Sequence, residues 1–340
     1  MDGYTVAILG ATGVVGTQMI TCLEEQEFPV KELKPLASAR SAGKKVVFQG
    51  REWTIEEARP EAFEGCDFVL GAAEDDVAKA LLPAAVERGA VVADNSHAFR
   101  LDPDVPLVIP EVNPGDVAWH KGIIASPNCA TTIALVPVWP LHEAAGVTRM
   151  VVSTYQAASG AGAAGMAELE AEVGALGRGE ELPEPRAFAA QLADNLIPQI
   201  GGFDPEGYTS EEMKMQNEGR KIMHLPDLRV CCTCVRVPVA RSHSESITLE
   251  FERKISLDEA REVLAAAPGV RLVDDREAAS AHDRFPMPLD TSDQDLVWVG
   301  RLRRDISNPE PDRGLTFWCC GDQIRKGAAT NTVQIAKLLV

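Results

Sequence analysis

Tyr4-Thr5-Val6-Ala7-Ile8-Leu9-Gly10-Ala11-Thr12-Gly13-Val14-Val15-Gly16 opens the chain and indicates its fold class. Six residues of strand type lead into a turn with glycine at every third position, and Met19, Ile20 and Leu23 follow at helical spacing. A glycine turn between a strand and a helix brings bare backbone to a helix N-terminus, where it can approach a pyrophosphate. The stretch therefore predicts a dinucleotide site rather than a mere tight turn.

The same alternation of strand and helix continues along the first third of the chain. It predicts an α/β fold whose N-terminal domain is a Rossmann-type, doubly wound parallel sheet. Later segments indicate a second α+β domain with a mixed or antiparallel sheet, and the last helix returns to the first domain. The expected strands are 33–37, 66–71, 90–94, 147–157, 229–239, 247–254, 301–305 and 315–320, and the expected helices are 77–88, 131–145, 211–223, 256–267 and 324–339.

The segment after the second strand bears on which dinucleotide binds. Folds that prefer NAD carry an acidic side chain here for the ribose 2′-hydroxyl, whereas this chain has Ser38-Ala39-Arg40-Ser41-Ala42-Gly43-Lys44. Arg40 and Ser41 are suited to a 2′-phosphate. NADP is therefore expected, and the alternative is a loop of solvated charges.

A cysteine at the start of a predicted helix is the candidate nucleophile. In Ser126-Pro127-Asn128-Cys129-Ala130-Thr131-Thr132, Pro127 keeps Ser126 out of the helical conformation and Asn128 is a good N-cap. Unpaired N–H groups of the first helical turn favour a thiolate and can hold an oxyanion. The alternative is that Cys129 is only a small buried side chain.

A thiolate mechanism needs a neighbouring base, and His243 is its natural candidate among six histidines. Gln156 ends a predicted strand and could orient a carbonyl group, while Arg100 could clamp an anion. Glu218 and Lys221 lie three apart on a helix, a spacing more often found in an exposed ion pair.

Composition excludes several classes of partner. The net charge of −18 among 340 residues argues against nucleic acid and anionic membranes. Eight cysteines match no zinc spacing, so no metal is expected, and core packing is favoured for Cys231, Cys232, Cys234, Cys319 and Cys320.

Nothing in the sequence suggests secretion or membrane insertion. Met1-Asp2-Gly3 begins no basic region with an apolar core behind it, and a cytoplasmic location is expected. The polar loop expected over 174–185 could be a lid, a partner arm or a plain surface insertion.

Five motifs, in order along nearly the whole chain, resemble those of the aspartate-β-semialdehyde dehydrogenase family. They are Gly10-Ala11-Thr12-Gly13 with Gly16, Ser126 to Cys129, Gln156-Ala157 with Ser159 to Gly162, Cys234 with Arg236 running to Ser242-His243-Ser244, and Lys326 to Ala329 with Asn331. Two departures stand out, because the family commonly has glycine at Ser242 and a small or polar residue at Cys231. Pro137 and Pro140 predict a kinked or shortened helix after Cys129.

The resemblance implies a role for each matching residue. Cys129 is the acyl-thioester nucleophile, His243 the acid/base and Gln156 the group that orients the carbonyl. The implied substrate-binding residues are Arg236 for the α-carboxylate, Glu218 for the amino group, and Arg100, Asn128 and Lys221 for phosphate. The implied cofactor-binding residues are Gly10, Thr12, Gly13, Val14, Val15, Arg40, Ser41, Ser159, Gly160 and Gln323.

The implied reaction is reductive dephosphorylation of L-aspartyl-4-phosphate to L-aspartate 4-semialdehyde with NADPH, in lysine, diaminopimelate, methionine, threonine and isoleucine synthesis. A homodimer or homotetramer is expected. The implied domains are an NADP-binding domain, 1–128 plus 323–340, and a catalytic and dimerisation domain, 129–322. The alternatives are an N-acetyl-γ-glutamyl-phosphate reductase and, in another class, a Cys/His acyl hydrolase or transferase without redox chemistry.

Overall fold

The protein is described by a computed structural model over residues 3–340, so Met1 and Asp2 of the N-terminal segment lie outside the described residues. The described chain forms two compact units. The first comprises the chain up to Asn128 together with Gly327–Val340, and the second is Cys129–Lys326. No helix within residues 3–340 is long and apolar enough to cross a membrane.

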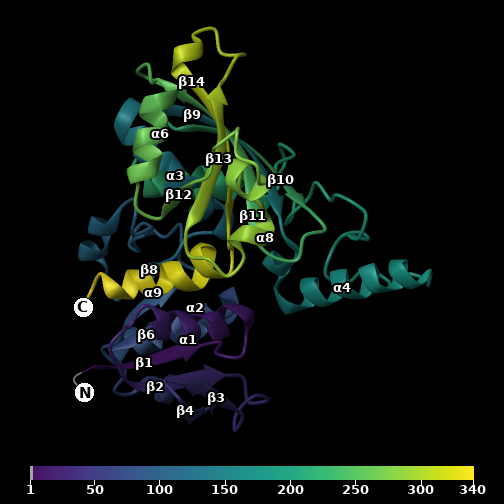
Figure 1. Ribbon diagram of the computed structural model, residues 1–340. Coiled ribbons are helices and arrows are strands. Elements are labelled where there is room, and N and C mark those ends of the chain that lie inside the picture. Colours follow the sequence, from purple (N-terminus) through teal and green to yellow (C-terminus); the bar gives the residue numbers. More distant parts are fainter. Residues whose placement is uncertain (1–2) are drawn as a thin grey trace. The chain divides into compact units, whose positions relative to one another are not determined.

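The first unit is built on a six-stranded parallel sheet, ordered β5-β2-β1-β6-β7-β8 (Figure 1). The strands are β1 (Tyr4–Leu9), β2 (Val30–Ala37), β5 (Glu56–Glu57), β6 (Phe68–Gly71), β7 (Val91–Asp94) and β8 (Ile123–Ala125). Helices α1 (Val14–Glu25) and α9 (Thr330–Lys337) share a core with Val6 and Ile8 of β1. Helix α2 (Asp75–Glu87) shares the opposite core with Ala7 and Leu9. Alternate residues of β1 thus serve both faces, which confirms the doubly wound fold.

A two-stranded hairpin in this unit was not anticipated. It consists of β3 (Lys45–Phe48) and β4 (Arg51–Thr54), joined by Gln49 and Gly50 at φ of 50° and 70°. Two successive positive φ angles suit the tight turn that matches the twist of a hairpin.

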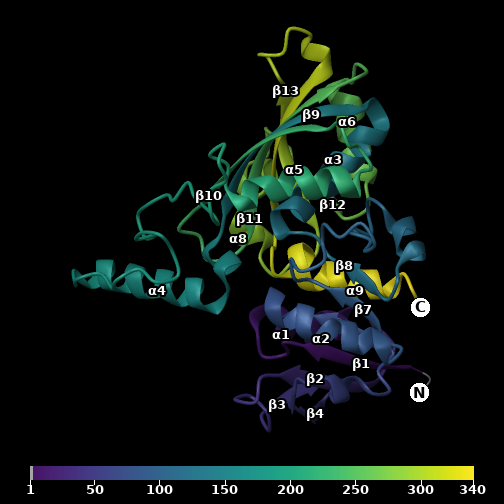
Figure 2. The same cartoon turned by 180° about the vertical axis from the view of Figure 1, so that it is seen from behind.

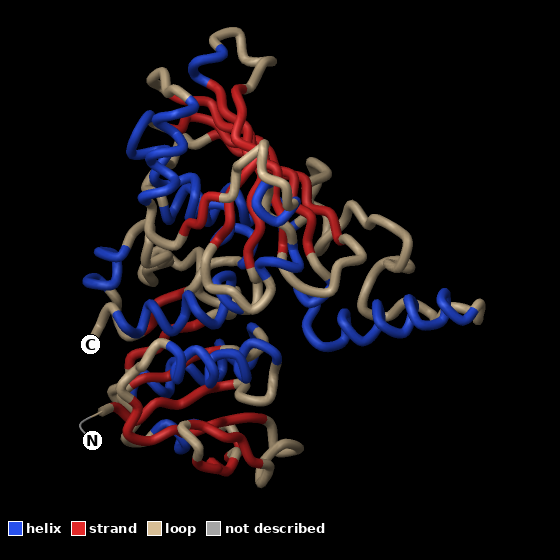
Figure 3. The backbone as a smooth tube through the Cα atoms, viewed as in Figure 1, coloured by secondary structure: helices blue, strands red, loops and turns tan. Residues whose placement is uncertain are grey.

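The second unit is built on a mixed six-stranded sheet, whose strands are among those drawn red in Figure 3. The strand order is β10-β9-β11-β14-β13-β12. The strands are β9 (Val147–Gln156), β10 (Arg229–Arg236), β11 (His243–Phe251), β12 (Val270–Leu272), β13 (Val297–Arg304) and β14 (Gly314–Gly321). Helices α3 (Cys129–Ala145), α5 (Ser210–Ile222) and α6 (Leu257–Ala266) lie on the same side of this sheet (Figure 2). The mixed sheet confirms the fold class expected for this part of the chain.

The remaining elements are short or peripheral. They are α4 (Gly162–Arg178), α7 (Ala281–Arg284), α8 (Pro288–Thr291), a π-helix at Arg325–Ala329, and 3₁₀ turns at Pro60–Phe63, Pro114–Trp119, Ala158–Ala161 and Pro311–Arg313.

Four expectations about these elements were wrong. Helix α3 runs unbroken through Pro137 and Pro140, because its residues from Ala130 to Val138 are buried and packing outweighs the two lost backbone hydrogen bonds. Helix α4 continues to Arg178, where Gly179 adopts the left-handed conformation that ends it, so the irregular segment begins later than 174. The final helix is a π turn followed by α9. Cys231 is exposed rather than part of the core, because β10 is an edge strand with one open face.

Candidate active site

Cys129 is the first residue of α3, directly after the turn at Pro127. The positive end of the dipole of this seventeen-residue helix lies at this position. The side chain is partly exposed, and its Sγ lies 3.4 Å from Nε2 of His243. The expected pairing of the two residues is therefore present, and the alternative of an inert buried cysteine fits poorly.

The backbone determines which nitrogen of His243 carries the proton. The Ala157 N–H donates to Nδ1 at 3.1 Å, so Nδ1 is an acceptor and the neutral ring holds its proton on Nε2, facing Cys129. Complete burial, reinforced by the Arg236 charge, lowers the pKa of His243 to about 3. His243 is therefore a neutral donor toward the sulfur at physiological pH.

Strand register brings the reactive side chains together. Gln156 and Arg236 are partners at the carboxyl ends of parallel strands β9 and β10. Strand β11 is antiparallel to β9 and pairs Ser244 with Tyr155, so its first residue, His243, lies at the same edge. Three segments that are distant in the sequence thus meet where α3 begins.

Gln156 is held by a residue that sequence reasoning missed. Its Nε2 donates to Oε1 of Glu211 at 3.2 Å and lies 3.4 Å from Oγ1 of Thr154. Glu211 is itself buried and accepts from Lys214 Nζ at 2.9 Å. Glu211 lies in the first turn of α5, and only the fold shows that this turn packs over the end of β9.

Arg236 is buried, and it donates from one terminal nitrogen to the carbonyl oxygen of Ala157 at 2.6 Å. Burial lowers its pKa, against the opposing effect of Cys129 and Glu211. A Cβ added to Gly160 would come within 2.6 Å of the Arg236 guanidinium and 3.1 Å of the His243 ring. Glycine at 160 is therefore what allows the two side chains to approach this backbone.

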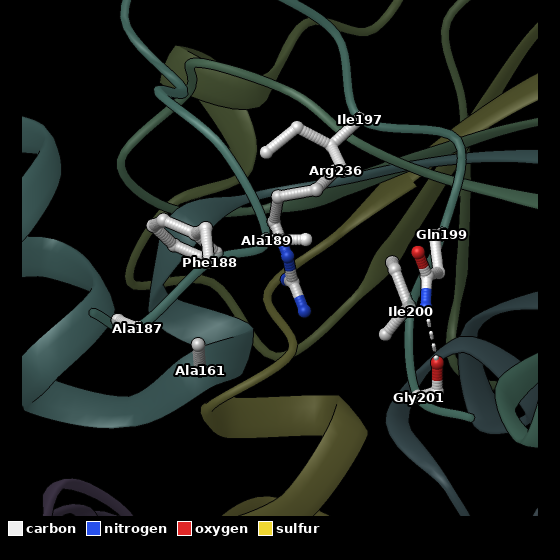
Figure 4. Close-up of a pocket in the computed structure, with 9 residues that line it drawn as sticks. All are labelled: Ala161, Ala187, Phe188, Ala189, Ile197, Gln199, Ile200, Gly201 and Arg236. Carbon is white, nitrogen blue, oxygen red and sulfur yellow. Dashed lines mark hydrogen bonds between the residues drawn. The ribbon is translucent and has the colours of Figure 1, made fainter. Parts of the chain in front are cut away.

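The Arg236 guanidinium also reaches into a cavity of about 160 Å³, which Figure 4 shows. The Phe188 ring forms part of the wall, and its centroid lies 5.7 Å from Arg236 Cζ. Most of the other lining residues belong to the connection between α4 and α5. The lining residues are Ala161, Ala187, Phe188, Ala189, Ile197, Gln199, Ile200, Gly201 and Arg236. One cation in a small and otherwise uncharged cavity suits a compact carboxylate.

Gln323 connects Ser159 with Ser242, the residue before His243. Its Oε1 accepts from the Ser242 N–H at 2.9 Å, and its Nε2 is in a very short contact with Ser159 Oγ. Ser242 has a φ of 72°, in the left-handed region where glycine is favoured. This conformation explains why glycine is common at that position in the resembling family, and it directs the chain into β11 at His243.

Glu218 and Lys221 both lie on α5, but they are not an exposed ion pair. Glu218 is fully buried and Lys221 is half-buried. The interpretation of their spacing as an exposed ion pair is thus wrong for Glu218.

The dinucleotide residues belong to the first unit. Gly10 has a φ of 90°, and a Cβ there would lie 2.4 Å from the Ala72 carbonyl oxygen, so the turn accommodates only glycine. Thr12 and Gly13 are exposed, Val14 begins α1, and α1 has no acidic residue in its first turn. An exposed backbone loop at a twelve-residue helix N-terminus fits a pyrophosphate.

A cavity of about 540 Å³ opens beside that turn, at the carboxyl ends of β1 and β2. Ser38 and Ala39 line it, and Arg40 and Ser41 follow directly in the chain. Glu57 also lines it, because β5 pairs Glu57 with Ala37. The sequence-based expectation overlooked this carboxylate, because it belongs to a different strand, twenty residues after its partner Ala37.

Arg100 and Asn128 are buried in the first unit. Arg100 donates from Nε to the Ser126 carbonyl oxygen at 2.9 Å and from a terminal nitrogen to that of Asn95 at 2.8 Å. These bonds fix Arg100 beside the segment that leads to Cys129.

The structure brings most of the predicted residues into two groups. In the second unit, Cys129 contacts His243, and His243 and Arg236 both lie beside Gly160. Gln156 pairs with Arg236 across β9 and β10, and Ser159 contacts Gln323. The glycine turn, Arg40, Ser41, Arg100 and Asn128 belong to the first unit.

Comparison with known proteins gives a consistent family. Family models described as "Semialdehyde dehydrogenase, NAD binding domain" and "Semialdehyde dehydrogenase, dimerisation domain" match residues 5–120 and 138–326. Aspartate-semialdehyde dehydrogenases of Aquifex aeolicus and Bacillus subtilis are 49% and 46% identical, each over 99% of this chain and 98% and 97% of the relative.

Solved structures agree. Aspartate semialdehyde dehydrogenase II of Vibrio cholerae, complexed with ASA, superposes on this chain with a TM-score of 0.94 at 42% sequence identity. The superposition covers 100% of this chain and 98% of the Vibrio cholerae chain. The Candida albicans enzyme with NADP gives a TM-score of 0.75 at 25% identity, over 99% and 98% of the two chains.

Proposed function

This chain belongs to the aspartate-semialdehyde dehydrogenase family and is an oxidoreductase, and we propose that it works through an acyl-thioester on Cys129. The family's reaction is reductive dephosphorylation of L-aspartyl-4-phosphate to L-aspartate 4-semialdehyde, in amino-acid biosynthesis. The relatives carry this name over their full length, and an NAD-binding family model matches. Neither the N-acetyl-γ-glutamyl-phosphate reductase nor the non-redox acyl hydrolase is favoured.

The first chemical step is proposed to occur at the Cys129 sulfur. The thiolate attacks the acyl carbon, a C–S bond forms, the C–O bond to phosphate breaks, and inorganic phosphate leaves. The positive end of the α3 dipole supports the thiolate and then the oxyanion of the addition intermediate. NADPH, when bound, supplies the hydride that reduces the thioester carbon, and the C–S bond then breaks to release the aldehyde.

His243 is proposed to act as a donor. Its Nε2–H faces the Cys129 sulfur, where the substrate carbonyl would bind, and the Ala157 N–H keeps Nδ1 unprotonated. The resemblance implies acid–base catalysis, and this tautomer favours stabilising the thiolate and the oxyanion over taking the thiol proton. A neutral ring with a pKa of about 3 stays in this form across the physiological range.

Substrate binding is proposed to use the remaining predicted residues. Arg236 holds the α-carboxylate, Glu218 the amino group, and Gln156, held by Glu211, orients the carbonyl. Arg100, Asn128 and Lys221 bind phosphate. Support comes from the burial of Arg236, whose guanidinium donates to a backbone carbonyl oxygen, since a buried cation suits a site where an anion binds.

The cofactor is a nicotinamide dinucleotide, and NADP is the proposed form. Gly10, Thr12, Gly13, Val14 and Val15 are suited to the pyrophosphate, and Arg40 and Ser41 to the 2′-phosphate. Ser159, Gly160 and Gln323 are proposed to bind the nicotinamide end. Glu57 in the cavity wall would repel a 2′-phosphate, which argues against a strict preference for NADP over NAD.

Arg40→Ala tests the NADP assignment. We expect the NADPH dissociation constant, measured by fluorescence titration, to rise at least tenfold while that of NADH changes less than twofold. An equal change for both cofactors would contradict a 2′-phosphate contact.

Assembly and location complete the proposal. The match to a dimerisation domain supports an oligomer, and we propose a homodimer or homotetramer acting on small molecules in the cytoplasm. Residues 1–128 plus 323–340 are proposed to bind the cofactor, and 129–322 to carry catalysis and dimerisation.

One observation carries the proposal: the 3.4 Å approach of Cys129 Sγ to His243 Nε2 at a helix N-terminus. The test is NADPH formation from aspartate semialdehyde and NADP, with and without phosphate. The intact chain should require phosphate, and Cys129→Ala should lose at least 10³-fold in rate. Near-normal turnover of the variant would exclude the covalent route.

A further inference from the structure

A further cavity, apart from the two described above, is lined almost entirely by arginine. It has a volume of about 400 Å³, and its lining residues are Arg276, Arg284, Phe285, Arg301 and Arg303. Four guanidinium groups thus share one site in a chain whose net charge is −18. Like charges that lie close together repel one another, so an anion bound among them would relieve that repulsion.

Within the described residues, no carboxylate lies within ion-pair distance of these four arginines. Three of the side chains donate hydrogen bonds to backbone carbonyl oxygens instead: Arg276 to Leu302, Arg284 to Ala278 and Ala279, and Arg303 to Arg301. The nearby Asp274 is already paired with Arg261 and accepts from the Leu302 N–H. Neutral acceptors fix the side chains without neutralising them, so the positive charge remains available.

The backbone at Arg301 is unusual. Arg301 has a φ of 56°, which few non-glycine residues adopt, and the register of β13 against β14 shifts between Gly300 and Arg303. A bulge of this kind redirects side chains at a sheet edge. Burial, then the charges of Arg301 and Arg276, lower the pKa of Arg303, in keeping with mutual repulsion.

The cavity is separate from the catalytic centre within the same unit. Arg303 pairs with Thr316 of β14, whereas His243 pairs with Gly321 of the same strand. Five residues of strand separate the two positions, or about 17 Å. A ligand in the arginine cavity therefore does not touch the reacting atoms.

We infer that this cavity binds a small anion carrying two or more phosphate or carboxylate groups. Guanidinium groups bind both oxyanions through paired hydrogen bonds, and several of them select multiply charged ligands over singly charged ones. The volume lies within the ordinary range of small-molecule sites and exceeds what one inorganic phosphate fills. Phe285 offers an apolar wall for the ligand's carbon or ring portion.

The test uses tripolyphosphate and citrate as probes, with acetate as the monovalent comparison, on the full chain. Titration calorimetry should show binding of at least one of the two probes and not of acetate. Hydrogen exchange should slow in 276–285 and 300–304 on binding. The two probes distinguish a phosphate-bearing ligand from a polycarboxylate.

The variants are chosen to spare the fold. Arg301→Gly suits the positive φ and removes one exposed cation, and with Arg303→Gln it should weaken binding at least tenfold. Arg304→Gln is the matched control, because Arg304 lies on the same strand, pairs with Asp312 and does not line the cavity. If the double variant is destabilised, Arg301→Gly alone should still weaken binding at least threefold.

Several outcomes would overturn the inference. They are no probe binding, binding without protection of these segments, or equal binding by the double variant and the control. Dissociation of the oligomer by Arg301→Gly, without any probe binding, would instead show that the arginines face a second copy of the chain.

Discussion

At the residue scale, the site depends on fixed hydrogen bonds around groups that must not rotate. Ala157 illustrates this, because its N–H sets the His243 tautomer while its carbonyl oxygen holds Arg236. One backbone unit thus orients both the donor to the sulfur and the cation for the substrate. Motifs could identify His243 and Arg236 from the sequence, but not the shared residue between them.

Glu211 is a positioning residue for Gln156, and its removal should slow catalysis more than it weakens binding. Glu211→Met removes the nearer of the two acceptors of Gln156 Nε2 and leaves only Thr154 Oγ1 at 3.4 Å, so we expect at least a tenfold loss in kcat with a small change in KM. The control is Glu211→Gln, which loses the ion pair to Lys214 equally but keeps an acceptor, and it should stay within threefold. Equal losses in both variants would contradict the positioning role.

At the element scale, apolar runs and glycine turns predicted the central strands and the helices that cover them. The hairpin β3–β4 was not predicted, because its side chains are mostly exposed and show no alternation of apolar and polar residues. The two prolines of α3 led to the opposite error, because they predicted an interruption that the structure does not have. Burial stabilises this helix although prolines locally disfavour it. Contacts between distant segments, such as Glu211 with Gln156 or the four arginines, leave no signal in a single sequence.

Ser242 at the entrance of β11 should tolerate only small residues. At a φ of 72°, Ser242→Val should lower the free energy of unfolding by about 2 kcal/mol or more, whereas Ser242→Gly should stay within about 1 kcal/mol. Urea unfolding measures both. A valine variant as stable as the glycine variant would mean that the turn relaxes to a negative φ.

Glu245 should make the second unit less stable at higher pH. It is fully buried in β11, neither carboxylate oxygen has a hydrogen-bond partner, and burial raises its pKa well above 4.5. The unfolded chain releases this proton near pH 4.5 while the folded chain retains it, so stability falls as pH rises above that value.

Glu245→Gln cannot ionise and removes that dependence. Relative to the variant, the intact chain should lose up to about 1.4 kcal/mol per pH unit above pH 4.5, until the folded pKa is reached. Urea unfolding between pH 4 and 8 measures the difference. A constant difference across this range would show that Glu245 is ionised in the folded chain.

At the scale of the whole molecule, α4 carries apolar side chains that its own unit leaves exposed. Val173 and Leu176 are 54% and 45% exposed, and their spacing of three places them on one face of the helix. In Figure 1, α4 extends away from the sheet of its unit. The segment lies within the match to a dimerisation domain, so we expect this face to be covered by a second copy.

Val173→Glu with Leu176→Glu should therefore weaken self-association. Sedimentation velocity should show at least a tenfold rise in the dissociation constant, whereas Leu289→Glu, at a residue that is 89% exposed, should leave it unchanged. An unchanged oligomer in the double variant would place the interface elsewhere on the second unit.

The covalent role of Cys129 is the central claim, and mass spectrometry of the trapped acyl-enzyme tests it most directly. Aspartate semialdehyde and NADP are mixed with the protein without phosphate, quenched in acid and digested. The account predicts an aspartyl group on the peptide containing Cys129, absent from Cys129→Ala and lost when phosphate is added before the quench. An enzyme that turns over while no peptide carries the adduct would contradict it.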